Sequence, residues 1–312
     1  MTSKHGLFVG LTTFDCIYQA THSPAPNEKI VAAKSLLVAG GPATNAAVAF
    51  AQLGGSSAQY ATLVSVLGEH PLTTVLREDL QEQGVTLVDL EPTKLLPPPI
   101  SSIVVTDSSG DRAVVSTNAA QMQAKANQVS IDILDGVSIV LIDGHQMAVG
   151  AQIAHWAKAK QIPVIVDAGS WKPNFDTVLA LADVVVASAS FFPPACSTPE
   201  QVFAYLTSLG VPQMAITQGA APILYREGNA EKTHYKIEVP QVRAVDTLGA
   251  GDIFHGAFCH FYQSHLFEES LLKASRSASF ACQYWGTRDW TKIYRMSDEA
   301  ETDEAEDEAS EN

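Results

Sequence analysis

The chain has 312 residues, of which 46% are hydrophobic, and its 34 acidic and 19 basic residues give a net charge of −15. This length and apolar content suffice for one large α/β domain with an appendage, or for two domains. No run of about 18 apolar residues is present, which predicts no membrane-spanning helix. The four cysteines lack Cys-x-x-Cys spacing, so neither a disulfide framework nor a zinc site is expected.

The negative charge is concentrated at the C-terminal end. Nine acidic residues and no basic ones lie between Asp298 and Glu311. Without these nine, 25 acidic residues face 19 basic ones, and the body carries a net charge of −6. The body has no basic stripe, so nucleic-acid binding is not expected. Residues 297–312 also lack apolar periodicity, and we expect an acidic, disordered tail after a single domain over residues 1–296.

The first expected strand lies near the N-terminus, at Leu7–Leu11. The residues before it lack the length and cleavage site of a signal peptide, which favours a cytoplasmic location. Asp15 follows this strand. Because α/β sheets bind ligands at the C-terminal ends of their strands, Asp15 could accept hydrogen bonds from two sugar hydroxyls. A surface turn residue is the equal alternative.

A glycine-rich turn at Gly40–Asn45 opens the first expected helix, and Gly54 or Gly55 is its expected C-terminal cap. A Gly-Gly pair before a helix is by itself a weak signal. Asn45 could bind a polyol hydroxyl or cap the turn, and the residues alone favour the cap.

Two segments, about 12–38 and 97–118, interrupt the alternation of strands and helices. They contain alternating or irregular strand-like runs such as Lys29–Ala32 and Ile103–Thr106. Pro97–Pro99 would provide a stiff entry to the second segment. We expect the two segments to pair into a small sheet that covers a cleft as a lid.

The remainder of the chain predicts a parallel sheet. Short, β-branched, almost continuously apolar runs are typical of strands that are covered on both faces. Helical spacing between them indicates right-handed crossovers. The expected strands are Ile139–Ile142, Val164–Val166, Val184–Val186 and Met214–Thr217, and the helices Ala148–Lys160 and Thr198–Leu209.

The most informative stretch is Asp246–Asp252, with the sequence Asp-Thr-Leu-Gly-Ala-Gly-Asp. A helix-compatible apolar run follows it. A glycine-rich turn that opens a helix presents unpaired N–H groups at the positive end of the helix dipole, which favours a phosphate. A carboxylate is not expected at an anion-binding site unless it has a function there. We interpret Asp252 as a general base beside a bound phosphate.

Together the two glycine-rich turns resemble the signatures of the PfkB (ribokinase-like) family of carbohydrate kinases. Gly40-Gly41-x-x-x-Asn45 is similar to the N-terminal signature, and Asp246-Thr247-x-Gly249-Ala250-Gly251-Asp252 to the highly specific C-terminal one. The resemblance covers about residues 5–290. It implies an α/β fold, with a doubly wound, mostly parallel sheet flanked by helices and a small β-sheet lid. It also implies transfer of the ATP γ-phosphoryl to a hydroxyl of a sugar or nucleoside.

The resemblance implies roles for the residues at the matching positions. Asp252 is the expected base, and Gly249, Ala250 and Gly251 form the anion hole, in agreement with the reading from the residues. The sugar contacts are Asp15, Gly40, Gly41 and Asn45. The ATP contacts are Thr217, Gly219, Gly249 and Gly251, and Asp246 and Thr247 lie where many members bind a monovalent cation such as K⁺.

The ketohexokinase-like subgroup is the nearest by resemblance, because Arg112 matches its lid arginine that reaches the sugar. An exposed lid arginine without that role is the alternative. The family also implies a homodimer formed through the lid. Many members carry Asn-x-x-Glu where this chain has Ser188–Phe191. We therefore expect Mg²⁺ to be held through ATP and water.

The leading hypothesis is an ATP-dependent kinase of a ketohexose or related polyol. A nucleoside kinase of the same fold is the alternative enzyme, although only Phe14 and Tyr18 near Asp15 offer aromatic rings for a base pocket. A non-catalytic binding or scaffolding descendant is the third possibility, and the missing Asn-x-x-Glu and the acidic tail motivate it.

Overall fold

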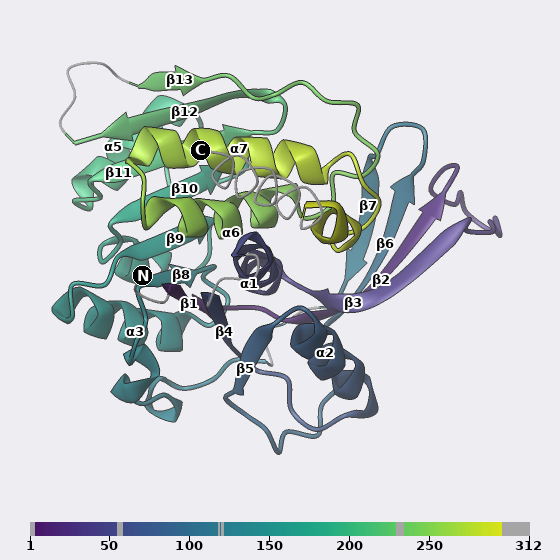
Figure 1. The fold of residues 1–312 in the computed structure, drawn as a ribbon, viewed down its shortest axis with the longest axis horizontal. Helices are drawn as coiled ribbons and strands as arrows, with labels where there is room; N and C mark the ends of the chain where they lie inside the picture. Colours follow the sequence, from purple (N-terminus) through teal and green to yellow (C-terminus); the bar gives the residue numbers. More distant parts are fainter. Residues whose placement is uncertain (1–3, 55–58, 118, 120–121, 229–233, 295–312) are drawn as a thin grey trace, which may run out of the picture.

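The computed structural model describes residues 4–54, 59–117, 119, 122–228 and 234–294. The strands of its main sheet are β1 (Lys4–Val9), β4 (Gln59–Ser65), β5 (Val85–Asp89), β8 (Ile139–Ile142), β9 (Val164–Ala168), β10 (Val184–Ser188), β11 (Gln213–Gln218), β12 (Ala221–Glu227) and β13 (Tyr235–Ile237). They are ordered β5-β4-β1-β8-β9-β10-β11-β12-β13 (Figure 1). The strands from β5 to β11 run parallel, and β12 and β13 are antiparallel to their neighbours.

Helices cover both faces of this sheet. One group consists of α1 (Pro42–Leu53), α2 (Pro71–Glu82), α6 (Ala250–Tyr262) and α7 (Phe267–Ala281). The other consists of α3 (Met147–Ala159), α4 (Phe175–Leu179) and α5 (Pro199–Ser208), with the 3-10 turns η2 (Ala126–Gln128) and η3 (Ile131–Leu134). Successive side chains of a strand point to opposite faces. Phe8 therefore joins the core under α1 and α6, whereas Leu7 and Val9 join the core under α3 and α5. The doubly wound parallel sheet expected from the sequence is confirmed.

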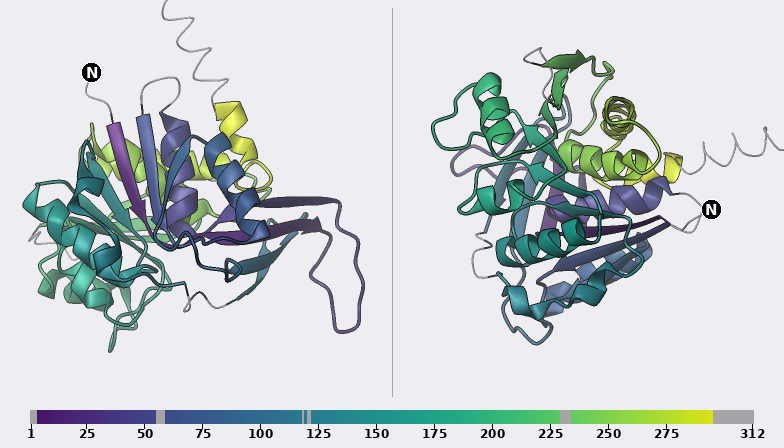
Figure 2. Two further views of the ribbon diagram at one scale, coloured as in Figure 1. Left: turned by 90° about the horizontal axis from the view of Figure 1, so that it is seen from below. Right: turned by 90° about the vertical axis from the view of Figure 1, so that its left-hand side faces the viewer.

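A second sheet of four strands forms the lid. Its strands are β2 (Thr13–Ala20), β3 (Lys34–Gly40), β6 (Ile100–Thr106) and β7 (Arg112–Ser116), in the order β3-β2-β6-β7. It projects from one side of the main body (Figures 1 and 2). Strands β2 and β6 are parallel, and the outer pairs are antiparallel. The lid is attached through a small core in which Ile17, Val38 and Ile103 pack with Trp285.

One expected lid strand is absent. Lys29–Ala32 has no strand structure, and β3 begins only at Lys34. Two prolines and Asn27, whose φ is 63°, turn the chain just before this run. Val31 is 86% exposed, so the apolar alternation of Lys29–Ala32 faces no core that would select a strand.

Other expectations concern the ends of elements. Gly54 caps the C-terminus of α1, as one of the two expected alternatives. No helix in the described part of the chain is long and apolar enough to cross a membrane. The predicted acidic tail at 297–312 lies outside the described residues, as does Gly55.

Candidate active site

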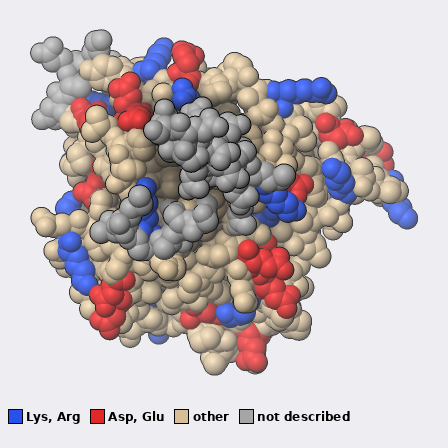
Figure 3. Space-filling view, in the orientation of Figure 1, with Lys and Arg blue, Asp and Glu red and all other residues tan. Residues whose placement is uncertain are grey.

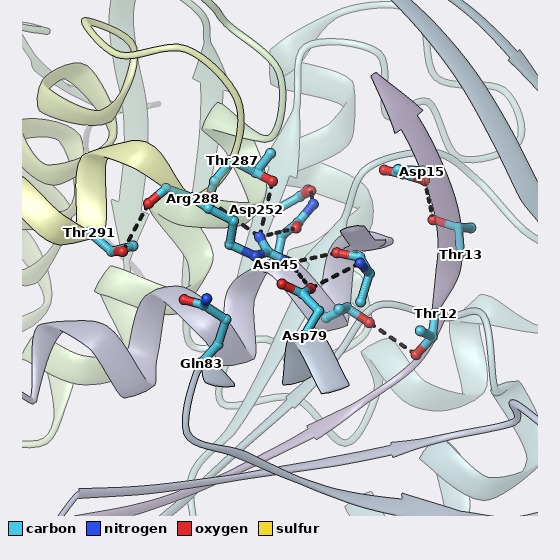
Figure 4. A network of polar contacts seen from close by, with 12 residues as sticks. Thr12, Thr13, Asp15, Asn45, Asp79, Gln83, Asp252, Thr287, Arg288 and Thr291 are labelled. Carbon is cyan, nitrogen blue, oxygen red and sulfur yellow. Dashed lines mark hydrogen bonds and ion pairs between the residues drawn. The ribbon is translucent and has the colours of Figure 1, made fainter. Parts of the chain in front are cut away.

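Asp252 lies in the first turn of α6, at the end of the helix that faces the lid (Figures 1 and 4). Gly249 is the N-cap, with φ of 70°, a conformation that favours glycine. Gly251 is exposed, and a Cβ added to it would meet no atom within 4 Å. The Ala250 N–H donates a long hydrogen bond of 3.3 Å to the Thr247 carbonyl. The turn thus has open space for an anion, which would compete with this carbonyl for the Ala250 N–H.

The Asp252 carboxylate is hydrogen-bonded to the other glycine-rich turn, Gly40–Asn45. Asn45 Nδ2 donates to Asp252 Oδ2 at 2.9 Å, which joins residues 207 positions apart. Burial, together with the nearby Asp167 carboxylate, raises the pKa of Asp252 to about 7. The Asn45 hydrogen bond and His255 oppose this rise. Such a carboxyl group exchanges its proton near neutral pH, as a general base must.

Asp15 lies on β2, where the lid joins the main body. The residue is buried, and its Oδ1 accepts a hydrogen bond of 2.6 Å from Thr13 Oγ1. Burial raises the pKa of Asp15, against the hydrogen bonds and the charge of Arg288. A Cβ added to Gly40 would lie 1.9 Å from Asp15 Oδ2, so only glycine leaves room for this carboxylate. The adjacent Gly41 has φ of 101° and begins α1.

Arg112 and the Asp246–Thr247 pair meet at the tip of the lid. The exposed Arg112 donates from Nη1 to Thr247 O at 3.3 Å and to Thr247 Oγ1 at 3.2 Å. Thr247 Oγ1 in turn donates to Gly110 O in the turn between β6 and β7. The Asp246 oxygens accept from the N–H groups of Leu248 and Gly286, both at 2.9 Å. Burial raises the pKa of Asp246. This arrangement docks the lid tip on the turn that precedes α6.

Thr217 and Gly219 lie at the end of β11, on the edge of the sheet where β10 also ends. Thr217 Oγ1 donates to Ala187 O at 3.3 Å, and Gly219 is exposed with φ of 63°. His255 links α6 to this edge, since its Nε2 lies 3.2 Å from Val186 O and its Nδ1 2.7 Å from Gly251 O. No contact joins Thr217 or Gly219 directly to Asp252 within the described residues.

Three polar residues of the site were not anticipated. Asp143, directly after β8, accepts hydrogen bonds from the N–H groups of Leu11, Ala43 and His145. Asp167, in β9, is buried and lies 3.5 Å from His255 Nδ1, and burial raises its pKa. Both follow or end expected strands, so the rule applied to Asp15 would have found them. The third, Arg288, follows α7 and had no such signal.

The segment that replaces Asn-x-x-Glu is occupied by a serine and an aromatic cluster. Ser188 Oγ donates to Gly169 O at 2.7 Å. Phe191 is buried, and its ring lies 6.0 Å from those of Trp171 and Phe175. In the described ranges, no three His, Cys, Asp or Glu side chains gather as metal ligands. Mg²⁺ does not require such a cluster, since it usually binds one or two carboxylates together with substrate phosphates and water.

One cavity of the molecule lies away from this site. A cavity of about 640 Å³ is lined by Asp183, Gln213 and Tyr262, among others. It lies where β10 and β11 begin, at the opposite edge of the sheet from Thr217. On the face shown in Figure 3, acidic and basic side chains are interspersed and form no basic stripe.

Comparison with known proteins identifies the family of this chain. The family model described as pfkB family carbohydrate kinase matches residues 4–292. The chain belongs to this family, whose members are phosphotransferases with an alcohol group as acceptor.

Individual relatives are more distant. A ribokinase from Arabidopsis thaliana is 27% identical over 300 residues, which cover 89% of this chain and 76% of the relative. The structure of Arabidopsis thaliana ribokinase complexed with ribose and ATP has a TM-score of 0.69 at 23% identity, covering 92% of this chain and 94% of that one. Adenosine kinase from Sinorhizobium meliloti has a TM-score of 0.74 at 17% identity, covering 95% and 100%. A structure from E. coli that contains ATP and Mg²⁺ has a TM-score of 0.70 at 20% identity, covering 93% and 96%. These structures share the ribokinase-like fold with this chain.

Proposed function

We propose that this protein transfers the γ-phosphoryl of ATP to a hydroxyl of a sugar, with Asp252 as the general base. One observation carries the proposal. Asp252 lies at the N-terminus of α6, its pKa is raised to about 7, and it accepts a hydrogen bond from Asn45 of the N-terminal glycine-rich turn. A base and an anion-binding helix end are thus adjacent. Phosphoryl transfer needs little else from a protein than positioning and electrostatic stabilisation.

In the proposed reaction, the substrate oxygen forms a bond to the γ-phosphorus while the bond from that phosphorus to the ADP oxygen breaks. The hydroxyl proton passes to Asp252. The N–H groups of Gly249, Ala250 and Gly251 stabilise charge on the equatorial oxygens, and the helix dipole adds to their effect. Bound Mg²⁺ would supply neutralisation of the phosphate charge, held by ATP and water. Thr217 and Gly219 line the ATP side in this proposal.

The sugar would lie between the lid and α1. Asp15, Gly40, Gly41 and Asn45 offer the oxygen acceptor, the open backbone and the amide that hydroxyl groups need. The relative from Arabidopsis thaliana that is 27% identical to this chain is a ribokinase, which supports D-ribose as the first substrate to test. A ketohexose remains the second, through the resemblance of Arg112 to a sugar-binding lid arginine.

A nucleoside is a weaker candidate. Phe14 and Tyr18 alternate with Asp15 on β2, so their rings lie on the opposite face of the strand. Phe14 packs in the core under α1 instead of lining a base pocket. The adenosine kinase of similar fold is only 17% identical to this chain, a level that speaks to the fold alone.

The remaining parts of the proposal concern ions, assembly and location. Asp246 and Thr247 are the candidate monovalent-cation ligands, but backbone N–H groups already bind both Asp246 oxygens, and Arg112 occupies the Thr247 carbonyl. Each of these oxygens keeps a second lone pair that could bind K⁺. A homodimer through the lid is supported by exposed apolar residues on its strands, including Val115, which is 76% exposed. We also propose a cytoplasmic location, where ATP is available.

The test is ADP release with MgATP across D-ribose, D-fructose, other aldoses and polyols, and adenosine. We expect one sugar to be phosphorylated and Asp252→Asn to lower its kcat by roughly 10²–10⁴-fold, because only the base is lost. Binding of ATP, measured by calorimetry, should change little. An unchanged kcat in Asp252→Asn would exclude Asp252 as the base, and ATP binding without turnover of any acceptor would favour the non-catalytic alternative.

A further inference from the structure

A buried arginine is hydrogen-bonded to the Asn45 side of the Asn45–Asp252 pair. Arg288 is 6% exposed and comes from the short segment after α7 (Figure 4). Its Nη1 donates to Asn45 Oδ1 at 3.2 Å, across 243 positions of sequence. The same nitrogen donates to Thr287 Oγ1 at 3.0 Å. The side chain therefore approaches the proposed base through a single intermediate, the Asn45 amide.

The two ends of the guanidinium make different contacts. Nη2 donates to Ala39 O at 2.6 Å and to Asp79 Oδ2 at 3.1 Å, which attaches the segment to β3 and α2. Asp79 also accepts from the Ala39 N–H, so this end of the arginine is part of a structural anchor. Nη1 faces Asn45 instead. The anchor fixes the guanidinium, and the guanidinium presents a fixed donor to the amide.

A fixed donor determines which way the amide points. An asparagine amide has a donating and an accepting end, and either could face Asp252. Arginine has five donors and no acceptor. Only the Asn45 oxygen can therefore face Arg288, and the Asn45 NH₂ must face Asp252. With the amide reversed, an oxygen would face the carboxylate and the NH₂ would face the guanidinium, and both contacts would be repulsive.

We propose that Arg288 is a positioning residue for phosphoryl transfer, which holds the Asn45 amide so that its NH₂ group orients the Asp252 carboxylate and favours its ionised form. The inference rests on the proposed function, because it assumes that Asp252 is the base. Arg288 itself touches neither base nor substrate. Its hydrogen bond to Asn45 carries this effect, and its charge also favours the ionised form of Asp15.

The charges around Asp252 show why such a donor matters. The carboxylates of Asp167 in β9 and Asp15 in β2 disfavour its ionised form, as does burial. His255 of α6 and the Asn45 amide of α1 favour it. Asp79 on α2 faces Arg288 and balances its charge. If the amide reversed, one of the two favourable contributions would become an unfavourable one.

The experiment compares the pH dependence of kcat/KM, with MgATP and the best acceptor of the panel, for the wild type and Arg288→Met. We expect the acidic limb of Arg288→Met to move to higher pH, and kcat to fall on the order of 10-fold to 100-fold. The KM for ATP should stay within about twofold of the wild-type value. Arg288→Lys retains a charged donor and should restore part of both losses. A direct titration of Asp252 by ¹³C NMR of its carboxyl carbon should show the same upward shift of its pKa without any substrate.

Asp79→Asn is the matched control. It weakens the anchor while it leaves the Arg288 donor and Asn45 in place, so it should lower the melting temperature and shift the acidic limb by much less than Arg288→Met does. If Arg288→Met fails to fold by circular dichroism, the double variant Asp79→Leu/Arg288→Met replaces it, since a buried ion pair is often replaced without loss by apolar residues.

The proposal is overturned if the limb and the Asp252 titration of the folded Arg288 variant coincide with those of the wild type. The same holds if Asp79→Asn shifts them as far as Arg288→Met does. Failure of the proposed function has a different signature. In that case the wild type would transfer phosphate to no acceptor, while the NMR titration of Asp252 would still respond to Arg288→Met.

Discussion

Two arginines lie near the turns around Asp252, and their surroundings differ. Arg112 comes from the lid, is exposed, and donates to Thr247 through hydrogen bonds of 3.2 and 3.3 Å. Arg288 comes from the segment after α7, is buried, and binds four residues. Water can replace the partners of Arg112 but not those of Arg288.

This difference separates two tasks in the molecule. An exposed hydrogen bond or ion pair contributes little net free energy, because water competes for both partners and side-chain entropy is lost. Such a contact can open and close easily, which suits a lid. A buried charged group is costly to leave without its partners, so it holds one geometry. The lid contact is therefore suited to exchange, and the Arg288 contacts to preorganisation.

The largest expected effect tests the anchor of the buried arginine. Asp79→Ala would leave the Arg288 charge without its carboxylate and the Ala39 N–H without its acceptor. We expect the free energy of unfolding to fall by about 3–5 kcal/mol, measured by urea denaturation.

Asp289→Ala is the control for that substitution. Its partner, Lys292, has 75% of its side chain exposed, and the pair is 3.5 Å apart. We expect a loss of about 0–1 kcal/mol. If both alanine variants lost equal stability, the contrast between buried and exposed contacts would not hold.

The second prediction concerns pH. Because Asp252 must be ionised to accept a proton and its pKa is raised to about 7, kcat/KM should fall as the pH drops through about 7. At pH 5 the loss should be roughly 100-fold, equivalent to about 2.7 kcal/mol. A pH-rate profile with MgATP checks it, and Arg112→Met should leave the limb in place. A profile without a limb between pH 5 and 8 would contradict the role of Asp252.

The raised pKa of Asp252 has the opposite effect on stability: whereas activity should increase with pH, the free energy of unfolding should decrease. Burial raises the folded pKa of Asp252 above the unfolded value of about 4, so the folded protein binds this proton more tightly. Its contribution to stability is complete below about pH 4 and is lost as the pH rises through about 7. Asp252→Asn should therefore flatten this part of the dependence of unfolding free energy on pH, measured with a matched wild-type series.

Much of the fold could be predicted from the sequence, because buried parallel strands require continuous apolar runs. Ile139–Ile142 matches β8 in both bounds, and the other three expected parallel strands fall within their observed strands. The run at Lys29–Ala32 shows the limit of the pattern. Its residues are apolar and strand-compatible, but the neighbouring turn leaves them without a surface to pack on. Local sequence does not show what a strand will pack against.

The residues of the site likewise fall into those that the sequence could predict and those that it could not. The two glycine-rich turns were visible as motifs, and the resemblance predicted that they act together, which agrees with the Asn45–Asp252 hydrogen bond. Asp143 could have been found, since it directly follows a predicted strand. Arg288 could not, because its role depends on contacts with residues more than two hundred positions away. Only the folded chain brings those residues together.

The third prediction tests the turn that places Asn45. Gly41→Ala would force alanine into φ of 101°, with its Cβ 2.4 Å from the Leu11 carbonyl oxygen. We expect a loss of about 1–3 kcal/mol in unfolding free energy, because backbone strain and a collision add together. Gly84→Ala is the matched control, since its φ is 74° but its Cβ would meet no atom within 4 Å. Gly84→Ala should cost only the strain, about 1 kcal/mol, and equal losses would show that the collision relaxes.

The smallest expected change in stability belongs to Arg112. Arg112→Met should lower the free energy of unfolding by about 0–1 kcal/mol, because its two long hydrogen bonds are exposed. If the lid arginine also binds the sugar, the KM for the sugar should rise in this variant while the KM for ATP and the acidic limb stay unchanged. Lys29→Met, at another exposed lid position, controls for the loss of a positive charge and should leave every constant unchanged. A shift of the acidic limb in Arg112→Met would mean that both arginines act on the base, and the division of tasks between lid and core would be wrong.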